Sequence, residues 1–118
     1  MNPSPETLGD LDAFAVRSDD VTRKGAQAFA RLLRLAETRD SGQIPRIARF
    51  LAATYNGQAF QLDLFELRAV DIAISDDMLS CLDALRWGRA DLHTLIPDGD
   101  ARVRVVIERW GLRWPSES

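Results

Sequence analysis

The sequence contains few of the residues on which covalent and metal chemistry most often depend. Cys81 is its only cysteine and His93 its only histidine. A single cysteine cannot form a disulfide within the chain, which favours a reducing compartment. A histidine without a cysteine or a second histidine at ligand spacing does not match a zinc site. We therefore expect neither a disulfide framework nor a zinc centre.

Long apolar runs and targeting segments are absent as well. No run approaches the ~20 residues of a membrane-spanning helix, and Met1–Glu6 lacks the basic and apolar regions of a secretion signal. The net charge of −3 disfavours broad, non-specific affinity for nucleic acid or anionic membranes. We expect a cytoplasmic protein that does not bind membranes.

The motifs of common enzyme classes are also missing. The sequence has no phosphate-binding glycine loop, no nucleophile elbow and no dinucleotide fingerprint. Cys81 falls on an apolar helical stripe, where thiols are usually inert, so a Cys81–His93 nucleophile pair is disfavoured. Asp76 and Asp83 would lie two helical turns, ~10 Å, apart, too far to share one metal ion. We predict no catalytic residue, no metal site and no cofactor, and hence no enzyme.

Helical periodicity dominates the rest of the chain. Residues 1–19 show little pattern and are interpreted as a flexible lead-in, with room for a short helical turn near Leu11–Val16. Asp19 and Asp20 could cap a helix over 21–38, where apolar residues share one face. Ser41 could cap a second helix from Ile44, with Pro45 in its first turn.

Turn signals divide the second half of the chain. Asn56-Gly57 would end the second helix through a left-handed residue, and Asp63 with Glu66 has the form of a capping box. An apolar stripe from Leu67 to Leu85 fits one continuous helix or two helices separated near Asp71–Ser75. Residues 88–100 are turn-rich, with room for one helical turn. A final helix over 103–110 would end at Gly111.

These segments predict an all-α fold, a single compact domain of four or five helices. We place its boundaries at 20–114, after the flexible N-terminal segment 1–19 and before a tail at 115–118.

Charge is distributed unevenly along the chain. Residues 21–49 hold seven basic side chains and two acidic ones, whereas residues 63–83 hold six acids and one arginine. The candidate basic face comprises Arg23, Lys24, Arg31, Arg34, Arg46 and Arg49. One alternative is that the basic outer face meets the acidic stretch of a neighbouring molecule, so that the protein self-associates head to tail or as a homodimer. The other is that both face solvent, where ion pairs contribute little.

Trp87 is the aromatic residue of most functional interest. If the helix extends to it, Trp87 projects away from the apolar stripe, towards the acids of the same helix. The candidate protein-binding residues are Trp87, Asp76, Ser80 and Asp83. An aromatic on such a face is typical of an interface anchor. The alternative is that Gly88 turns the chain and Trp87 packs under the following loop.

Several short stretches resemble a known family. They are Phe29–Ala36, Asp40–Gln43, Ala48–Leu51, Tyr55-Asn56, Asp63-Leu64, Asp76–Met78 and Arg109-Trp110, with Asp71 and Ile74 between them. Together they resemble a family of small uncharacterised proteins carried by proteobacterial plasmids and integrative conjugative elements. This resemblance implies a bacterial mobile-element setting and transfers no activity or site residue.

We therefore expect a helical module that binds a protein partner, with inhibition of a host defence complex as one version of that function. The alternative is a DNA-associated accessory or regulatory protein. In that case the two helices of the basic stretch would act like a helix-turn-helix, with Arg46 and Arg49 near a groove.

Overall fold

The structure, a computed structural model, describes residues 5–115, with side chains described from Gly9 onward. These residues form four α-helices and two short 3-10 helices and include no strand, which confirms the predicted all-α class. Residues 1–4 of the expected lead-in and 116–118 of the expected tail lie outside the described part.

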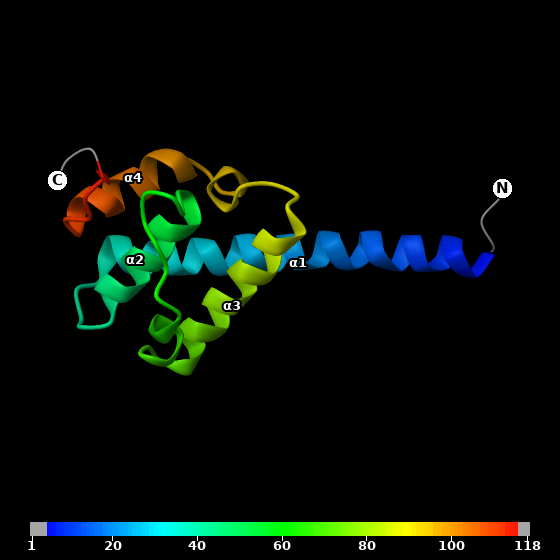
Figure 1. Cartoon of the computed structure of the whole chain (residues 1–118), viewed down its shortest axis with the longest axis horizontal. Coiled ribbons are helices and arrows are strands. Elements are labelled where there is room, and N and C mark those ends of the chain that lie inside the picture. The colour runs from blue at the N-terminus through cyan, green and yellow to red at the C-terminus, as the bar shows by residue number, and fades with distance from the viewer. Residues whose placement is uncertain (1–4, 116–118) are drawn as a thin grey trace.

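Helix α1, Pro5–Thr38, is the axis of the molecule. Its 34 residues span about 51 Å at 1.5 Å each, close to the longest dimension of the protein, 56 Å. The other helices surround its C-terminal half, while its N-terminal part projects alone (Figure 1). We call residues 5–17 the arm.

The described residues before residue 20 form more helix than the short turn expected there, because α1 is continuous from Pro5. Pro5 is tolerated in a first turn, which needs no N–H. Asp19 and Asp20 lie inside the helix and cap nothing. The helical pattern also continues towards the N-terminus, since Phe14, Ser18 and Val21 follow one another at spacings of four and three. The predicted boundary at 19/20 therefore falls within α1.

One apolar core joins α1 to the helices around it. Its largest fully buried side chains are Phe29, Leu32, Leu33, Ile47, Phe50, Leu51, Met78, Val103 and Val106. The six turns of α1 between Ser18 and Thr38 supply one wall, and α2, α3 and α4 supply the others. Because the core begins only near Ala28, the arm contributes nothing to it.

Helix α2, Ile44–Tyr55, has Pro45 in its first turn as predicted, but its N-cap is Gln43 and not Ser41. The Gln43 side chain is instead turned towards the start of α3. Its Oε1 accepts the N–H of Asp71 at 3.0 Å, and its Nε2 donates to the Asp71 carboxylate at 2.9 Å. Gln43 thus links the beginnings of two helices that are 28 residues apart.

The turn after α2 differs from the predicted left-handed ending. Gly57 does not have a positive φ angle, and Asn56 is extended, with φ −151°. The Asn56 side-chain oxygen accepts the N–H groups of Gln58 and Ala59, both at 3.1 Å. This side-chain turn replaces the glycine ending because asparagine can cap a turn with its own amide.

The stripe over 67–85 is divided, as one of the two alternatives predicted. A 3-10 helix, η1, spans Leu64–Arg68, and Asp63 caps it by accepting the Phe65 N–H at 2.9 Å. Helix α3, Ile72–Trp87, then begins directly after Asp71. Leu85, expected on the buried stripe, is exposed.

The C-terminal elements follow the predicted order. Gly88, with φ 67°, ends α3, and the 3-10 helix η2, Leu92–Leu95, lies in the expected loop. Helix α4, Gly99–Arg109, ends as predicted at Gly111, also with φ 67°. The N–H groups of Gly111 and Leu112 return to carbonyls of α4 at 3.1 and 3.0 Å, which is the hydrogen-bond pair of a glycine-ended helix.

Candidate protein-interaction surfaces

The outward side of α3 carries exposed apolar residues between acids. Ile72 and Leu79 are 76% and 53% exposed, and residues 72, 76, 79 and 83 recur at helical spacing on one side of the helix. We call Ile72, Asp76, Leu79 and Asp83 the outer face of α3. The opposite side of the helix packs on the core through Met78, Cys81 and Ala84.

The predicted protein-binding residues are therefore only partly together. Asp76 is exposed on the outer face of α3, and Asp83, two turns further along the same face, is held by Arg86 at 2.6 Å. Ser80 is partly buried at the edge towards α1, where its carbonyl lies close to Gly25. The two apolar members, Ile72 and Leu79, were not predicted. Their spacing to Asp76 and Asp83 was the available signal.

Trp87 faces the arm of α1 and not an acidic surface. Helix α3 does extend to it, and its ring packs against that of Phe14 with 4.7 Å between centroids and 55° between planes. Phe14 remains 61% exposed, whereas Trp87 is half-buried. The indole N–H of Trp87 is buried without an acceptor among residues 5–115.

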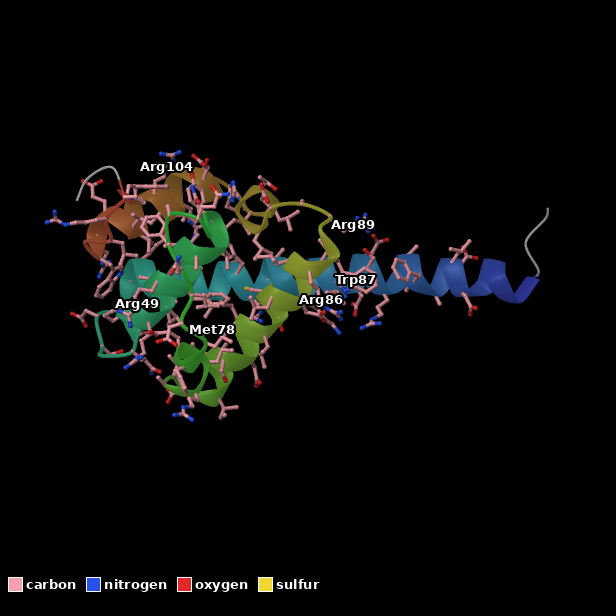
Figure 2. All side chains as sticks on the ribbon, viewed as in Figure 1. Arg49, Met78, Arg86, Trp87, Arg89 and Arg104 are labelled. Atoms are coloured by element: carbon pink, nitrogen blue, oxygen red, sulfur yellow. The ribbon has the colours of Figure 1, made fainter. Side chains whose placement is uncertain are left out.

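Two guanidinium groups complete this site. The Cζ atoms of Arg17 and Arg86 lie 5.3 and 6.0 Å from the centroid of the Trp87 ring, within reach of a cation–π attraction. Figure 2 shows Trp87 and Arg86 where α3 ends beside α1. We call Phe14, Arg17, Arg86 and Trp87 the elbow. They line a shallow groove of about 340 Å³.

Arg89 fixes the geometry of the elbow from the loop after α3. Its guanidinium donates to the hydroxyl of buried Ser18 at 3.0 Å and to the carboxylate of Asp19 at 2.6 Å. This contact ties the end of α3 to α1 where the arm begins. Neither Phe14 nor Arg17 was predicted as a site residue, because residues 1–19 lacked an evident pattern.

The predicted basic face is divided among separate acids. Arg23 and Lys24 both reach Asp20, at 2.5 and 3.0 Å. Arg31 binds Asp77 of α3 through two hydrogen bonds of 2.8 and 3.2 Å. Arg34 is exposed and has no ion pair with a described residue.

Arg46 and Arg49 converge on Glu66, the predicted partner in a capping box. Arg49 donates to the buried Glu66 carboxylate at 2.9 Å, and Arg46 lies 3.3 Å from its other oxygen without hydrogen-bond geometry. The Glu66 side chain therefore pairs with α2 and does not return to the backbone of Asp63. Six of the twelve residues of α2 are buried and only Arg49 is exposed, so this helix presents little surface to a DNA groove.

The residues considered for chemistry lie apart. Cys81 is fully buried, and burial raises the pKa of its thiol to about 12, with the Asp77 carboxylate adding to the shift. His93, in η2, packs its ring against that of Tyr55, with 4.8 Å between centroids and 59° between planes. Within the described residues, no three histidine, cysteine or acidic side chains are grouped so as to hold a metal ion. No helix in this part of the chain has the length and apolar character to cross a membrane.

Comparison with known proteins gives one match. The model of a family of unknown function, DUF7673, matches residues 26–111. Neither a curated protein nor a solved structure matches the chain. The matched range runs from the middle of α1 to the end of α4 and includes the outer face of α3 and the whole core, but not the arm. Since it covers most of the sequence, the chain belongs to this family of unknown function, DUF7673.

Proposed function

We propose that this protein is a small helical interaction module that acts by binding a protein partner through the outer face of α3. The observation that supports this most directly is the exposure of Ile72 and Leu79 between the carboxylates of Asp76 and Asp83. Two apolar side chains seven residues apart on one helix face match the anchor spacing of helices that dock into a groove.

The charges of this face define the kind of partner. Asp76 has no ion pair with a described residue, so its carboxylate is available to a basic side chain. Asp83 shares its charge with Arg86. A complementary partner has an apolar groove for Ile72 and Leu79 and basic residues at its rim, because matched potentials favour association and suppress wrong partners.

The setting of this function is also part of the proposal. The resemblance to proteins of plasmids and integrative conjugative elements supports a role in the bacterial cytoplasm on behalf of a mobile genetic element. There, the partner would be a host or element protein, and inhibition of a host defence complex is one form of the function. No catalytic step is required, since occupancy of the partner's groove suffices.

The alternative, DNA binding through the basic face, receives less support from the geometry. Arg31, Arg46 and Arg49 already contact Asp77 or Glu66, so binding phosphates would require these ion pairs to be exchanged. Duplex binding that weakens steeply with salt is the signature of phosphate contacts. Such binding by the purified protein would favour this alternative over the interaction module.

The experiment that tests the proposal is affinity capture from the native host, followed by affinity measurement with the purified partner. The double variant Ile72→Ala, Leu79→Ala removes both anchors without altering the core. We expect it to lose at least about tenfold in affinity, which corresponds to about 1.4 kcal/mol. Asp76→Arg, which reverses the available charge, is expected to weaken binding further.

Val105→Ala is the matched control. Val105 is an exposed apolar residue on α4, away from α3, and its truncation should leave the affinity unchanged. A partner that binds the wild type and the double variant equally would show that the outer face of α3 is not the binding surface.

A further inference from the structure

The apolar stripe of α1 continues beyond the elements that cover it. Residues 14, 18, 21, 25, 29 and 32 recur at helical spacing, and those from Gly25 onward are buried beneath α3 and the core. Towards the N-terminus, Leu11 and Phe14 remain on this side of the helix but are 58% and 61% exposed. The arm thus extends an established helix interface past the end of α3 (Figure 1).

The arm carries a negative charge near its tip and a positive charge at its base. Asp10 lies towards the tip and Arg17 at the base, on the same edge of the stripe, seven residues or about 10 Å apart. Neither has an ion pair with a residue of the described part. Of the other acids near Arg17, Asp19 binds Arg89 and Asp20 binds Arg23 and Lys24, whereas Asp12 lies on the other side of the arm.

We propose that the arm binds the arm of a second copy of this chain in antiparallel orientation. Two-fold symmetry about a point near Phe14 brings the Phe14 residues of the two copies together. It also places Asp10 of each copy beside Arg17 of the other, because the two residues are almost equidistant from that point. A parallel pair would oppose Asp10 to Asp10 and Arg17 to Arg17, which like charges disfavour.

The second copy also fits the elbow. In the antiparallel pair, the acidic tip of one arm lies over the basic base of the other, where Arg17 and Arg86 flank Trp87. Leu11 and Phe14 of the second copy cover the groove of about 340 Å³ between these side chains. The arm is only ~20 Å long, so the contact is small and its dimer dissociates on dilution.

This inference rests on the proposed function as an interaction module but uses a different surface, so the two can fail separately. Self-association involves the arm and the elbow, whereas the partner is assigned to the outer face of α3. A wild type that binds its partner through the outer face of α3 but stays monomeric would overturn only the inference. A wild type that dimerises, but whose partner binding is unchanged by Ile72→Ala, Leu79→Ala, would overturn only the proposed function.

The test is sedimentation equilibrium of the purified full chain between about 1 μM and about 1 mM, the range in which small interfaces dissociate. We expect the wild type to pass from monomer to dimer in this range. Phe14→Ala, Asp10→Arg and Arg17→Glu should each remain monomeric. All three positions are exposed, so circular dichroism should show an unchanged helical fold.

Charge exchange tests the antiparallel geometry directly. An equimolar mixture of Asp10→Arg and Arg17→Glu should form a dimer, because each interface ion pair is then between opposite charges. The double variant Asp10→Arg, Arg17→Glu should dimerise without a second protein for the same reason. The controls Asp12→Arg and Val16→Ala alter the other side of the arm and should dimerise like the wild type. A monomeric wild type at the highest concentration, or a mixture that stays monomeric while the wild type dimerises, would overturn the inference.

Discussion

Gly25 of α1 and Ala84 of α3 meet at a close approach of the two helices. A methyl group built on Gly25 would lie 2.2 Å from the Cβ of Ala84 and 3.1 Å from the carbonyl oxygen of Ser80. Neither neighbour is the end of a flexible side chain. Glycine is therefore required at position 25 by the helix crossing, which in turn sets the angle at which α3 leaves the core and places Trp87 at the elbow.

The first prediction is that Gly25→Ala destabilises the protein although alanine favours helices. Alanine should gain up to about 1 kcal/mol of helix propensity, but overpacking against α3 costs about 1–3 kcal/mol. We expect a net loss of about 1–2 kcal/mol in the free energy of unfolding, measured by urea denaturation.

Gly9→Ala is the control for this prediction. Gly9 is also in α1, but a methyl group there would meet nothing within 4 Å, so the variant should be neutral or slightly stabilised. Adding Ala84→Gly to Gly25→Ala should recover part of the lost stability. Equal effects of the two alanine substitutions would mean that the helices can separate at no cost.

A second prediction concerns the C-terminal end of α1. The indole N–H of Trp110 donates to the carbonyl of Ala36 at 2.9 Å, one of the last carbonyls of α1, which lack a partner within the helix. Trp110→Phe keeps most of the aromatic packing and removes this donor. We expect a loss of about 1 kcal/mol, the net value of one such hydrogen bond, detected as a lower urea midpoint.

Trp114→Phe provides the comparison for Trp110→Phe. Trp114 packs its ring against Phe60 at 4.8 Å, and its N–H makes no hydrogen bond with a described residue. A change of indole to phenyl at this position should therefore alter stability less. Similar losses in both variants would attribute the effect at position 110 to ring size and not to the hydrogen bond.

The sequence predicted those parts of the fold in which one face of a helix is buried. Burial imposes the apolar period seen in α2, α3 and α4. Gly111 ends α4 because a residue without a side chain adopts the positive φ angle needed there. The helical arm was not predicted because its residues from 9 to 17 are exposed, although Phe14 packs on Trp87. Without a buried face, the helical spacing of Leu11, Phe14 and Ser18 covers too few residues to distinguish a helix from an irregular segment.

The candidate surfaces were harder to predict than the helices. Asp76 and Asp83 follow from helical phase alone, but the contacts of Trp87 with Phe14 and Arg17 depend on how α3 crosses α1. The same holds for Glu66, whose local pattern indicated a cap while Arg46 and Arg49 of α2 bind it in the fold. Tertiary pairing of a charge is not encoded in its neighbours along the chain.

The third prediction uses this buried carboxylate. In Arg46→Ala, Arg49→Ala, Glu66 keeps its burial and loses both cations, so stability should fall by about 1–3 kcal/mol, the cost of an unsatisfied charged group at a partly wetted site. Adding Glu66→Gln removes the uncompensated charge and should restore part of the loss. Chemical denaturation of the three proteins measures both effects.

Arg34→Ala is the matched control, because Arg34 is exposed and has no ion pair within the described residues. Its substitution should change stability by less than about 0.5 kcal/mol. If the double variant were no less stable than Arg34→Ala, the Glu66 cluster would contribute nothing to folding.

The last prediction follows from the protonation of Cys81. Burial raises the pKa of its thiol from an ordinary value of 9.0 to about 12, so the folded protein keeps the thiol proton at pH values where the unfolded chain has lost it. Native Cys81 should react with iodoacetamide at pH 8 far more slowly than the urea-unfolded chain, since only the thiolate attacks. Rapid alkylation of the folded protein would contradict its burial.

The same shift predicts how stability depends on pH. Between about pH 9 and pH 12 the folded state binds one more proton than the unfolded state, so the free energy of unfolding falls as pH rises, by up to about 1.4 kcal/mol per unit. Tyr55, whose pKa is raised by burial and by its hydrogen bond to Asp100, adds to the slope above its ordinary value of 10.0. Cys81→Ala removes the thiol contribution and should show a shallower decline from pH 8.5 to 10, although its stability at neutral pH is lower because of the cavity. Parallel pH profiles for the wild type and Cys81→Ala would show that the thiol ionises alike in the folded and unfolded states. The buried contact between Cys81 and the Gly25 carbonyl, 3.8 Å long, would then have to open at high pH.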